Sequence, residues 1–599
     1  MKENAISTNE QYNLEQNDFF IRKTSGRFLL SSILGMVSIY MASVIDTFLV
    51  GMYLGEDGLA AMSLIGPVYL VFYTVGATIG IGGSVTASRA LGRDQLAEYH
   101  RIFTLSTVLL AIASLVMLVC GYAFVNPIMK VLSGSEDGIC AEMARTYFLF
   151  YIPGGVMTLM SYIPLYFFRV EGKPKISSRL FTMSAVVNLV LSWIFISPVC
   201  SMGIAGVSLA TSISMGCVTV TGFILILRGR SELRFAKGGF KKERCREMVI
   251  AGIPNGISNL LESARILLVN RLLIFSGAAV MLTCFTVIRN VSEILSAVII
   301  GISSAIMPLA GVFFGERDYI DVRLTLKRTM KFGIVLMAVL VALVCIFAEP
   351  VFRFFGVDDP TLIAEGKWAI PLACFGLVAA HANNLYASFY TSINREGLAT
   401  VLISLRLFFL LAAFAIPLAF TVGSKGVWLS FSLAEFATLG VFYLIRNALI
   451  RKKPSLDRYL LDTDEEKNPN INFSVKNDVY EIVDASQKVS DFCEDNEVDA
   501  SRQMKVSLAI EEILTFLLKY CLGEDRENYV AVRICLVGKE VTIRFRFVGN
   551  LFNPLDFYKE NEENAELAED LLGIKMMIRS AKSIDYRKTL GANNLTLVF

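Results

Sequence analysis

Charged side chains stand inside long apolar runs of this sequence, where hydrocarbon or a protein core would surround them. Asp46 lies within the apolar run 27–50, and Glu262 lies within 247–276. A charge at such a position costs about 2.5–3.5 kcal/mol or more in hydrocarbon, so it needs a partner or a function. A buried carboxylate can take up a proton or bind a cation, which is the chemistry of ion coupling. For Asp46 the alternative is a structural, hydrogen-bonded aspartate near a helix end.

Two of these runs carry opposite charges at helical spacing. Arg265 follows Glu262 at i+3, and Glu293 follows Arg289 at i+4, so each pair lies on one helix face. For Glu262, cation binding and a structural ion pair with Arg265 are equal alternatives. For Arg289 and Glu293 we favour a structural pair.

The runs that hold these charges belong to a pattern along most of the chain. Of the 599 residues, 54% are hydrophobic and 18% are charged, against about 45–50% and about 25% in ordinary globular proteins. A soluble core cannot hide that much apolar surface, which disfavours a soluble enzyme or a nucleic-acid-binding protein. Twelve runs reach the roughly 20 residues that span a bilayer: 27–50, 59–88, 101–126, 140–168, 176–198, 203–227, 247–276, 280–313, 330–355, 362–392, 397–420 and 425–448.

Lysine and arginine are concentrated in alternate loops. The loops after runs two, four, six and eight are basic, and the loop after run six carries eight of these residues between Arg228 and Arg246. Cytoplasmic loops of membrane proteins carry this excess, so we expect a multi-pass protein of the cytoplasmic membrane with both termini in the cytosol. The charge changes sign near residue 451. Residues 1–450 hold 35 Lys and Arg against 27 Asp and Glu, and residues 451–599 hold 21 against 27.

Short motifs recur half a chain apart. Residues 90–94 resemble 314–318, and the turn 168–172 resembles the turn 393–397. Because the matching segments lie in loops of the same sidedness, they indicate two six-helix repeats in the same orientation. In transporters with internal repeats, the substrate site lies near the membrane midplane between the repeats.

The stretch Asp46-Thr47-Phe48-Leu49-Val50-Gly51, followed by Gly58-Leu59-Ala60-Ala61, resembles the first-helix signature of the multidrug and toxic compound extrusion (MATE) family. The turn 168–172 and the segments 188–196, 206–212 and 384–435 continue the resemblance, which covers about residues 25–450. It implies twelve helices in two six-helix lobes, and a bacterial antiporter that exchanges H⁺ or Na⁺ for small organic, often cationic, compounds. The bilayer and those compounds are then its partners.

The resemblance also implies roles for particular residues. Asp46 matches the family's first-helix carboxylate, and Asn188 and Thr211 match positions around it, where packing is an equal alternative. Ser192 stands where one branch has a second Asp, so that branch's ion chemistry does not transfer directly. Glu262 resembles another branch's cation-site Glu. Two further positions match an Arg and a Glu that are frequent in the family and that we expect to form a structural pair: Arg406 and Glu435.

Aromatic and methionine side chains in the apolar runs suit a pocket for flat organic cations. Packing or lipid contact is the alternative for each. The candidates for such a cavity are Tyr69, Tyr73, Met157, Met160, Tyr386 and Tyr390.

Motifs for other chemistries are missing from the sequence. No Cys-x-x-Cys pair occurs, and the two histidines are far apart, so we expect no metal site and no cofactor. No Gly-x-x-x-x-Gly-Lys-Ser/Thr motif occurs, which disfavours ATP-driven pumping. We therefore expect a transporter driven by an ion gradient and not an enzyme.

The last 130 residues have the composition of a soluble α/β sandwich domain. Segments 471–475, 530–536, 541–547 and 595–599 read as strands, and 503–522 and 565–580 have helical periodicity. The order resembles the ATP-binding domain of anti-sigma factors and sensor histidine kinases. Departures from that family's site make ATP and Mg²⁺ binding doubtful and favour a degenerate, protein-binding module. The positions of this degenerate site are Glu512, Phe516, Phe547, Gly549 and Gly573.

These readings divide the chain into six parts: 1–24, a cytosolic tail; 25–228, the first lobe; 229–246, a basic loop; 247–450, the second lobe; 451–470, a linker; and 471–599, the ATPase-like domain. Two other functions stay open. One is a lipid-linked oligosaccharide flippase of the wider superfamily, and the other is a membrane sensor whose tail binds a cytosolic regulatory protein.

Overall fold

The computed structural model describes most of the chain as two compact units. The described residues are 2–133, 139–238, 240–275, 281–354, 359–462, 469–476, 478–522, 529–538, 540–548, 553–562, 564 and 567–599. One unit consists of Arg27–Asp318 and Thr325–Lys453, and the other of Met1–Gly26, Tyr319–Leu324 and Pro454–Phe599.

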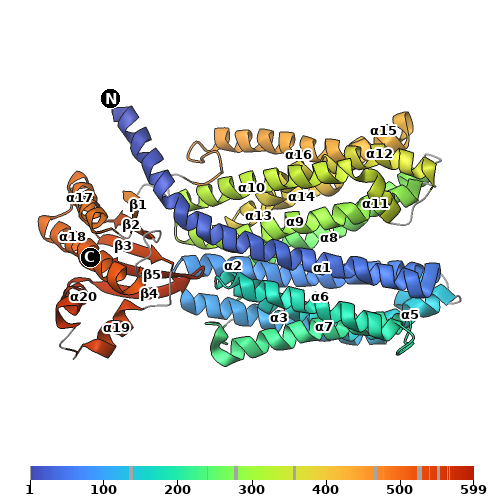
Figure 1. Cartoon of the computed structure of the whole chain (residues 1–599), viewed down its shortest axis with the longest axis horizontal. Coiled ribbons are helices and arrows are strands. Elements are labelled where there is room, and N and C mark those ends of the chain that lie inside the picture. Colours follow the sequence, from blue (N-terminus) through green and yellow to red (C-terminus); the bar gives the residue numbers. More distant parts are fainter. Residues whose placement is uncertain are drawn as a thin grey trace. The chain divides into compact units, whose positions relative to one another are not determined.

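The first half of the larger unit is helical, as the apolar runs predict, because helices satisfy their own backbone groups in hydrocarbon. A left-handed residue, Gly55 (φ 65°, ψ −153°), breaks the first helix where the first two runs meet. In Figure 1 these helices are coloured blue to teal. They are α1 (Lys2–Gly76), η1 (Ala77–Ile81), α2 (Gly82–Gly92), α3 (Leu96–Ala123), α4 (Val125–Ser133), α5 (Ile139–Val170), α6 (Pro174–Ile196), α7 (Ile204–Leu225) and η2 (Ile226–Arg230).

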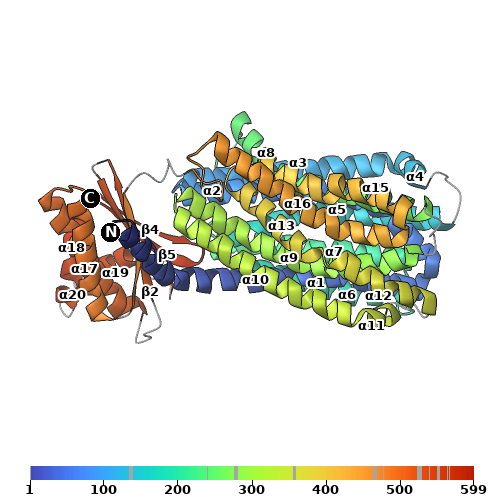
Figure 2. The same ribbon diagram turned by 90° about the horizontal axis from the view of Figure 1, so that it is seen from above.

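The second half repeats this helical pattern, coloured green to orange in Figures 1 and 2. Its elements are α8 (Lys242–Phe275), α9 (Met281–Gly315), α10 (Tyr319–Ile346), α11 (Ala348–Phe354), α12 (Pro360–Cys374), α13 (Leu377–Ser392), α14 (Glu396–Ser404), η3 (Leu405–Phe409), α15 (Leu410–Val422) and α16 (Ser424–Lys452). The tenth predicted run is divided between α12 and α13.

Eleven helices of the described chain are long and apolar enough to cross a membrane, against the twelve that we expected. The difference lies at the seventh predicted run. Its helix, α8, has 34 residues, which is ample length, but it carries Glu262, Arg265 and Arg271 in its second half. The charged residues that make α8 a functional candidate also lower its hydropathy, so a count based on hydropathy omits this helix.

Two π-helical segments interrupt the membrane helices. The first, η1, lies in the glycine-rich stretch between α1 and α2, and the second, η3, lies between α14 and α15 and contains Arg406. Such segments widen a helix locally and are frequent at functional sites.

The C-terminal part holds a small antiparallel sheet covered by helices, consistent with the additional α/β domain that the sequence predicts. Its elements are β1 (Asn470–Lys476), α17 (Val479–Asp495), α18 (Ala500–Leu517), η5 (Leu518–Leu522), β2 (Tyr529–Val537), β3 (Glu540–Phe547), α19 (Pro554–Asn561), α20 (Ala568–Ser580), β4 (Ser583–Thr589) and β5 (Ala592–Val598). The strand order is β1-β2-β3-β5-β4. The sequence reasoning did not predict α17 or α19 as separate elements.

One hydrophobic core joins the sheet to the helices α17, α18 and α20. Phe473, Val532 and Phe545 are paired neighbours on successive strands, and Phe545 is paired in turn with Leu595. All four belong to a buried cluster that also contains Val489 of α17 and Met577 of α20.

Candidate ion and substrate site

Asp46 lies in α1 with only 8% of its surface exposed. Its carboxylate is close to the side chains of Ser192 and Asn188 on α6. Asn188 Nδ2 donates a hydrogen bond of 3.2 Å to Thr211 Oγ1 on α7. The fold therefore brings together four of the five residues that the sequence grouped as ion-coupling candidates.

Three side-chain oxygen atoms in this group are buried and have no hydrogen-bond partner of normal geometry among the described residues. They are Asp46 Oδ1, Asn188 Oδ1 and Ser192 Oγ. Buried polar atoms are nearly always satisfied, so a group of three that are not marks a place for another partner. A proton on Asp46 or a small cation would supply what these oxygen atoms lack.

A cluster of tyrosines adjoins this group. The Tyr69 ring meets the Tyr151 ring edge-on with centroids 4.3 Å apart, and the Tyr69 hydroxyl donates to the Tyr147 hydroxyl. Tyr73 stacks on Tyr69 at 6.4 Å and is 40% exposed. Tyr147 is within electrostatic range of Asp46. The aromatic candidates Tyr69 and Tyr73 thus lie next to the ion-coupling candidates.

The other four cavity candidates lie on α5 and, in the second half, on α13. Met157 and Met160 are half-buried on α5. Tyr386 and Tyr390 stack on each other in α13 at 6.1 Å and both pack on Phe442 of α16. Tyr390 is fully buried, so in this conformation it packs in the core of the second half and touches no open space.

Two ion pairs predicted for the second half are present. Arg265 Nη2 donates to Glu262 Oε1, and Arg289 Nε lies 3.7 Å from Glu293 Oε1. The side chains of Glu262, Arg289 and Glu293 are 39%, 40% and 42% exposed, so none of these groups is sealed in the core. Glu262 is thus already paired, and its role in cation binding stays a prediction.

The predicted pairing between Arg406 and Glu435 is also present. Arg406 Nε donates to Glu435 Oε1 at 3.1 Å. Asn383 Nδ2 donates to the other carboxylate oxygen at 2.8 Å. This buried network ties η3, α13 and α16 together, as the structural interpretation expects.

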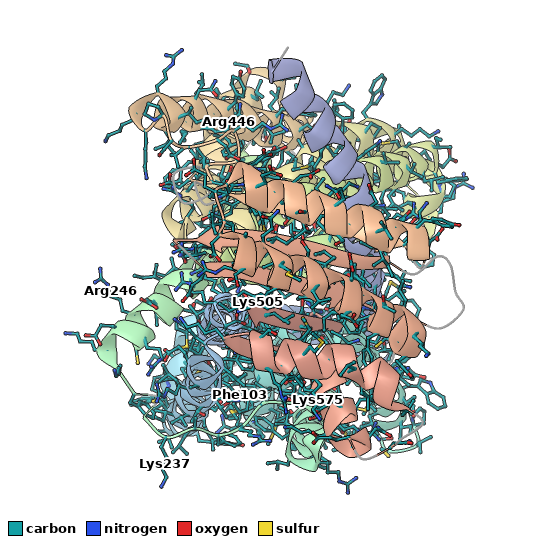
Figure 3. The ribbon with its side chains drawn as sticks, turned by 90° about the vertical axis from the view of Figure 1, so that its left-hand side faces the viewer. Phe103, Lys237, Arg246, Arg446, Lys505 and Lys575 are labelled. Carbon is teal, nitrogen blue, oxygen red and sulfur yellow. The ribbon has the colours of Figure 1, made fainter. Side chains whose placement is uncertain are left out.

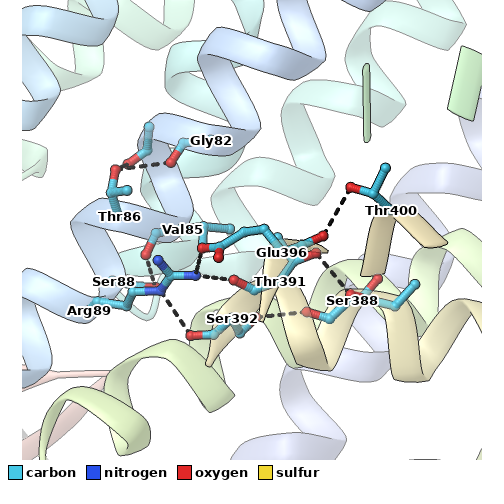
Figure 4. A network of polar contacts seen from close by, with 12 residues as sticks. Gly82, Val85, Thr86, Ser88, Arg89, Ser388, Thr391, Ser392, Glu396 and Thr400 are labelled. Carbon is cyan, nitrogen blue, oxygen red and sulfur yellow. Dashed lines mark hydrogen bonds and ion pairs between the residues drawn. The ribbon is translucent and has the colours of Figure 1, made fainter. Parts of the chain in front are cut away.

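A further buried ion pair, which the sequence reasoning did not find, joins the two halves. Figure 4 shows Arg89 of α2 reaching the turn between α13 and α14. Its Nε donates to the Ser392 carbonyl at 3.0 Å, and its Nη2 donates to the Thr391 carbonyl and to Glu396 Oε1, the last at 2.7 Å. The Arg89 and Glu396 side chains are 8% and 14% exposed. The sequence marked Arg89 only as a loop cation.

Close glycine contacts surround this ion pair. A side chain on Gly82 of α2 would overlap the backbone of α8, and a side chain on Gly252 of α8 would overlap the backbone of Thr78 in η1. The same holds for Gly92 and Gly315 between α2 and α9. A second cross-half ion pair joins Arg244 Nη2 of α8 to Glu98 Oε2 of α3 at 2.6 Å. The two halves are therefore in close contact at the end of the bundle where we predict the cytoplasmic loops.

In the C-terminal domain, two positions of the predicted degenerate site carry phenylalanine side chains that pack against other residues. Phe516 packs on Tyr520 at 4.9 Å and on Phe557 at 5.7 Å, and Phe547 is fully buried in the sheet core. A side chain on Gly573 of α20 would overlap the carboxylate of Glu512 on α18. Gly549 lies outside the described residues.

The helical repeats and the buried ionisable groups define a multi-pass membrane transporter. A model of the MatE family matches residues 31–194 and 254–422, once in each half and over more than half of the chain. The chain belongs to this family, whose members are transporters and not enzymes. The two matched segments also correspond to the two repeats that the loop motifs indicate.

Curated relatives resemble this chain over nearly their whole length. An FAD transporter of Shewanella oneidensis is 24% identical over 438 residues, which are 70% of this chain and 94% of the relative. The multidrug export protein MepA of Staphylococcus haemolyticus is 23% identical over 444 residues, 72% of this chain and 93% of the relative.

Solved structures share the fold of the helical part. A MATE transporter in complex with MaL6 superposes with a TM-score of 0.68 at 20% identity, over 72% of this chain and 98% of that one. A multidrug resistance MATE family transporter in an outward-facing conformation also gives 0.68, at 19% identity over 72% and 96%.

Proposed function

We propose that the protein is a secondary active exporter that exchanges H⁺ or Na⁺ for small organic compounds by alternating access. In this proposal α8 is the twelfth membrane-spanning helix, the helices form two six-helix lobes, and both termini lie in the cytosol. The observation that carries the proposal is the buried Asp46 beside Asn188 and Ser192, whose oxygen atoms lack a full complement of hydrogen bonds.

The coupling step rests on the charge of Asp46. An ionised carboxylate in this buried place is costly, so it gains from binding a proton or a cation. Binding would replace its contacts with Ser192 and Asn188 and neutralise the charge next to Tyr147 and Tyr69. An organic cation stacked on those rings would compete with the coupling ion for attraction to the Asp46 carboxylate.

In alternating access, the contacts between the two halves at the predicted cytoplasmic end must form and break. Opening toward the predicted cytoplasmic side must separate α2 from α8 and α9 and break the Arg89–Glu396 pair. The described arrangement therefore corresponds to the state that is closed on that side.

Counter-ion dependence of transport tests the coupling residue. The assay uses proteoliposomes with an imposed H⁺ or Na⁺ gradient. We expect the rate of gradient-driven ethidium transport to be at least ten-fold lower in Asp46→Asn than in wild type. Asp57→Asn, which changes an exposed aspartate close by in the sequence, is the matched control and should transport like wild type. Wild-type transport by Asp46→Asn, with the same ion dependence, would remove Asp46 from the mechanism.

An aromatic nucleotide is a second candidate substrate. The first relative given above carries the name FAD transporter. The side chains of Arg265 and Arg289 are 23% and 40% exposed, and their guanidinium groups could bind phosphates. The same proteoliposomes loaded with FAD decide between the two. FAD export that is lost in Arg265→Gln but kept in Arg353→Gln would favour the nucleotide.

For the C-terminal domain we propose a regulatory role as a protein-binding module. An aromatic cluster of Phe516, Tyr520, Phe557 and Tyr558 includes Phe516, one of the positions that the resemblance assigns to a nucleotide site. A cytosolic partner protein is the ligand that fits such a degenerate domain. Binding of a fluorescent ATP analogue to the full chain, competed by ATP, would contradict this assignment.

A further inference from the structure

The connector between the two halves carries an unusual surface. The segment Arg228–Lys242, called the basic connector below, links η2 to the start of α8. It contains six Lys and Arg and a single acidic residue, Glu232. Both ends join helices of the membrane bundle, so the basic connector lies at a boundary between membrane and water whichever way the protein is oriented.

The backbone of the basic connector is held in place from the N-terminal half. Glu171 Oε1 accepts hydrogen bonds from Ser231 Oγ at 2.6 Å and from the backbone N–H of Glu232 at 2.8 Å. Lys173 Nζ donates to the Arg230 carbonyl at 2.8 Å. The N–H of Ala236 donates to a side chain of α3 at 2.9 Å. These contacts fix residues 230–236 of the connector as a strap on the first half.

Toward solvent the same strap presents cations and aromatic rings together. Phe235 is 54% exposed and Phe240 is 59% exposed. The exposed cations on and just after the connector are Arg228, Arg230, Arg234, Lys237, Lys241, Lys242 and Arg246. In Figure 3 the labelled side chains of Lys237 and Arg246 point away from the ribbon. Large exposed apolar side chains are costly in water unless another surface covers them.

We infer that the basic connector binds the headgroups of an anionic phospholipid leaflet. The charge pattern is complementary to such a surface, and each Lys or Arg near it strengthens attachment. Phenylalanine side chains beside cations enter the headgroup region, as in interfacial membrane-binding segments. The connector joins the ends of two membrane helices, which places it within reach of that leaflet. The inference goes beyond the proposed transport function and does not depend on the substrate or the coupling ion.

The test measures lipid retention by the purified full-length protein. Released from nanodiscs with equal phosphatidylglycerol and phosphatidylcholine, the protein is analysed by native mass spectrometry for the lipids that remain bound. We expect phosphatidylglycerol to predominate for wild type. In Arg234→Gln/Lys237→Gln/Lys241→Gln its preference should fall, by up to roughly 100-fold in relative affinity, since each cation contributes about five-fold.

A matched variant distinguishes the effect of the connector from the effect of a lower net charge. Lys505→Gln/Lys519→Gln/Lys559→Gln removes three exposed cations of the C-terminal domain and should retain phosphatidylglycerol like wild type. Phe235→Ser/Phe240→Ser should lower retention of both lipids. Equal phosphatidylglycerol retention by wild type, the connector variant and the control would overturn the inference.

Wild type alone provides a second readout should the triple variant fail to insert. Attraction between charges weakens at high salt, so the preference for phosphatidylglycerol should decline between 50 mM and 500 mM NaCl. Inorganic phosphate at equal ionic strength should displace no more lipid than NaCl. A preference that is insensitive to salt, or absent, would contradict the inference. Transport is not measured in any arm, so failure here leaves the proposed function untouched.

Discussion

At the residue scale, the polar group around Asp46 combines burial with incomplete hydrogen bonding. A merely structural aspartate would be expected to have its oxygen atoms satisfied. Here Asp46 Oδ1, Asn188 Oδ1 and Ser192 Oγ all lack a full partner in the part of the chain described. The resemblance implies that Ser192 replaces a second Asp of one family branch, so we predict one coupling carboxylate in this group. A single carboxylate binds one proton or one monovalent cation.

Single glycines at helix contacts are the other residue-scale feature. In Gly252→Ala the new methyl group would overlap the backbone of Thr78, so α8 must move away from the first half. We expect a loss of about 1–3 kcal/mol in stability, the usual cost of overpacking, seen as a lower midpoint in a thermal scan of the purified protein.

Gly440→Ala is the matched control for that change. It lies within α16, and nothing stands within 4 Å of the position of an added methyl group. Alanine is the better helix former, so the midpoint should stay the same or rise. Equal midpoints for both variants would show that the contact between η1 and α8 tolerates separation.

At the scale of elements, α2 is the main contact of the first half with the second. Its end carries both the glycine contacts and Arg89, whose partner Glu396 begins α14. The corresponding residue of the first repeat, Glu171, binds the basic connector instead. The same turn therefore serves two purposes, holding the two halves together in one repeat and fixing a loop in the other.

Breaking the α2–α14 contact should favour opening at that end. In Arg89→Gln the carboxylate of Glu396 loses its charged partner, which costs on the order of 3–5 kcal/mol when a pair is buried. We expect hydrogen exchange of residues 85–93 and 391–397 to accelerate at least ten-fold, measured by mass spectrometry on the reconstituted protein.

An exposed ion pair provides the comparison. Arg353 pairs with Glu349 at 2.7 Å, but its side chain is 64% exposed, so Arg353→Gln should leave exchange unchanged. Should Arg89→Gln show wild-type exchange in both segments, the pair would not hold the halves together. Glu396→Gln should resemble Arg89→Gln but with a smaller effect, because Arg89 retains its two carbonyl acceptors.

At the scale of the whole molecule, the chain combines a transporter of its family with an additional domain. The relatives match about 70% of this chain and more than nine-tenths of their own length. Transport should therefore reside in the helical unit. If the domain is regulatory, removal of residues 454–599 should leave transport of the reconstituted protein within about two-fold of wild type.

Gel filtration of the shortened protein must accompany that measurement. A variant that is monodisperse and inserted but inactive would show that the C-terminal domain takes part in transport. A variant with normal activity that no longer responds to a cytosolic extract would support regulation by a partner.

The sequence by itself determined the class of this protein. The apolar runs, the alternation of basic loops and the repeated motifs identified a membrane transporter with two similar halves, since hydrophobic length and loop charge act locally. The pairs Glu262–Arg265 and Arg289–Glu293 were also readable, because helical geometry places i+3 and i+4 neighbours together. Asp46 was identifiable for the same kind of reason, as a charge alone in an apolar run.

Only the tertiary structure decided which distant residues meet. Nothing local to Arg89 indicates that it reaches Glu396, which is 307 positions away, and nothing local to Glu171 indicates that it fixes the basic connector. The structure also showed that Tyr390 is packed in the core and that Phe516 packs on Tyr520 and Phe557 in the C-terminal domain. Composition reports what each segment must bury, but the contact that buries it depends on how the helices pack against one another.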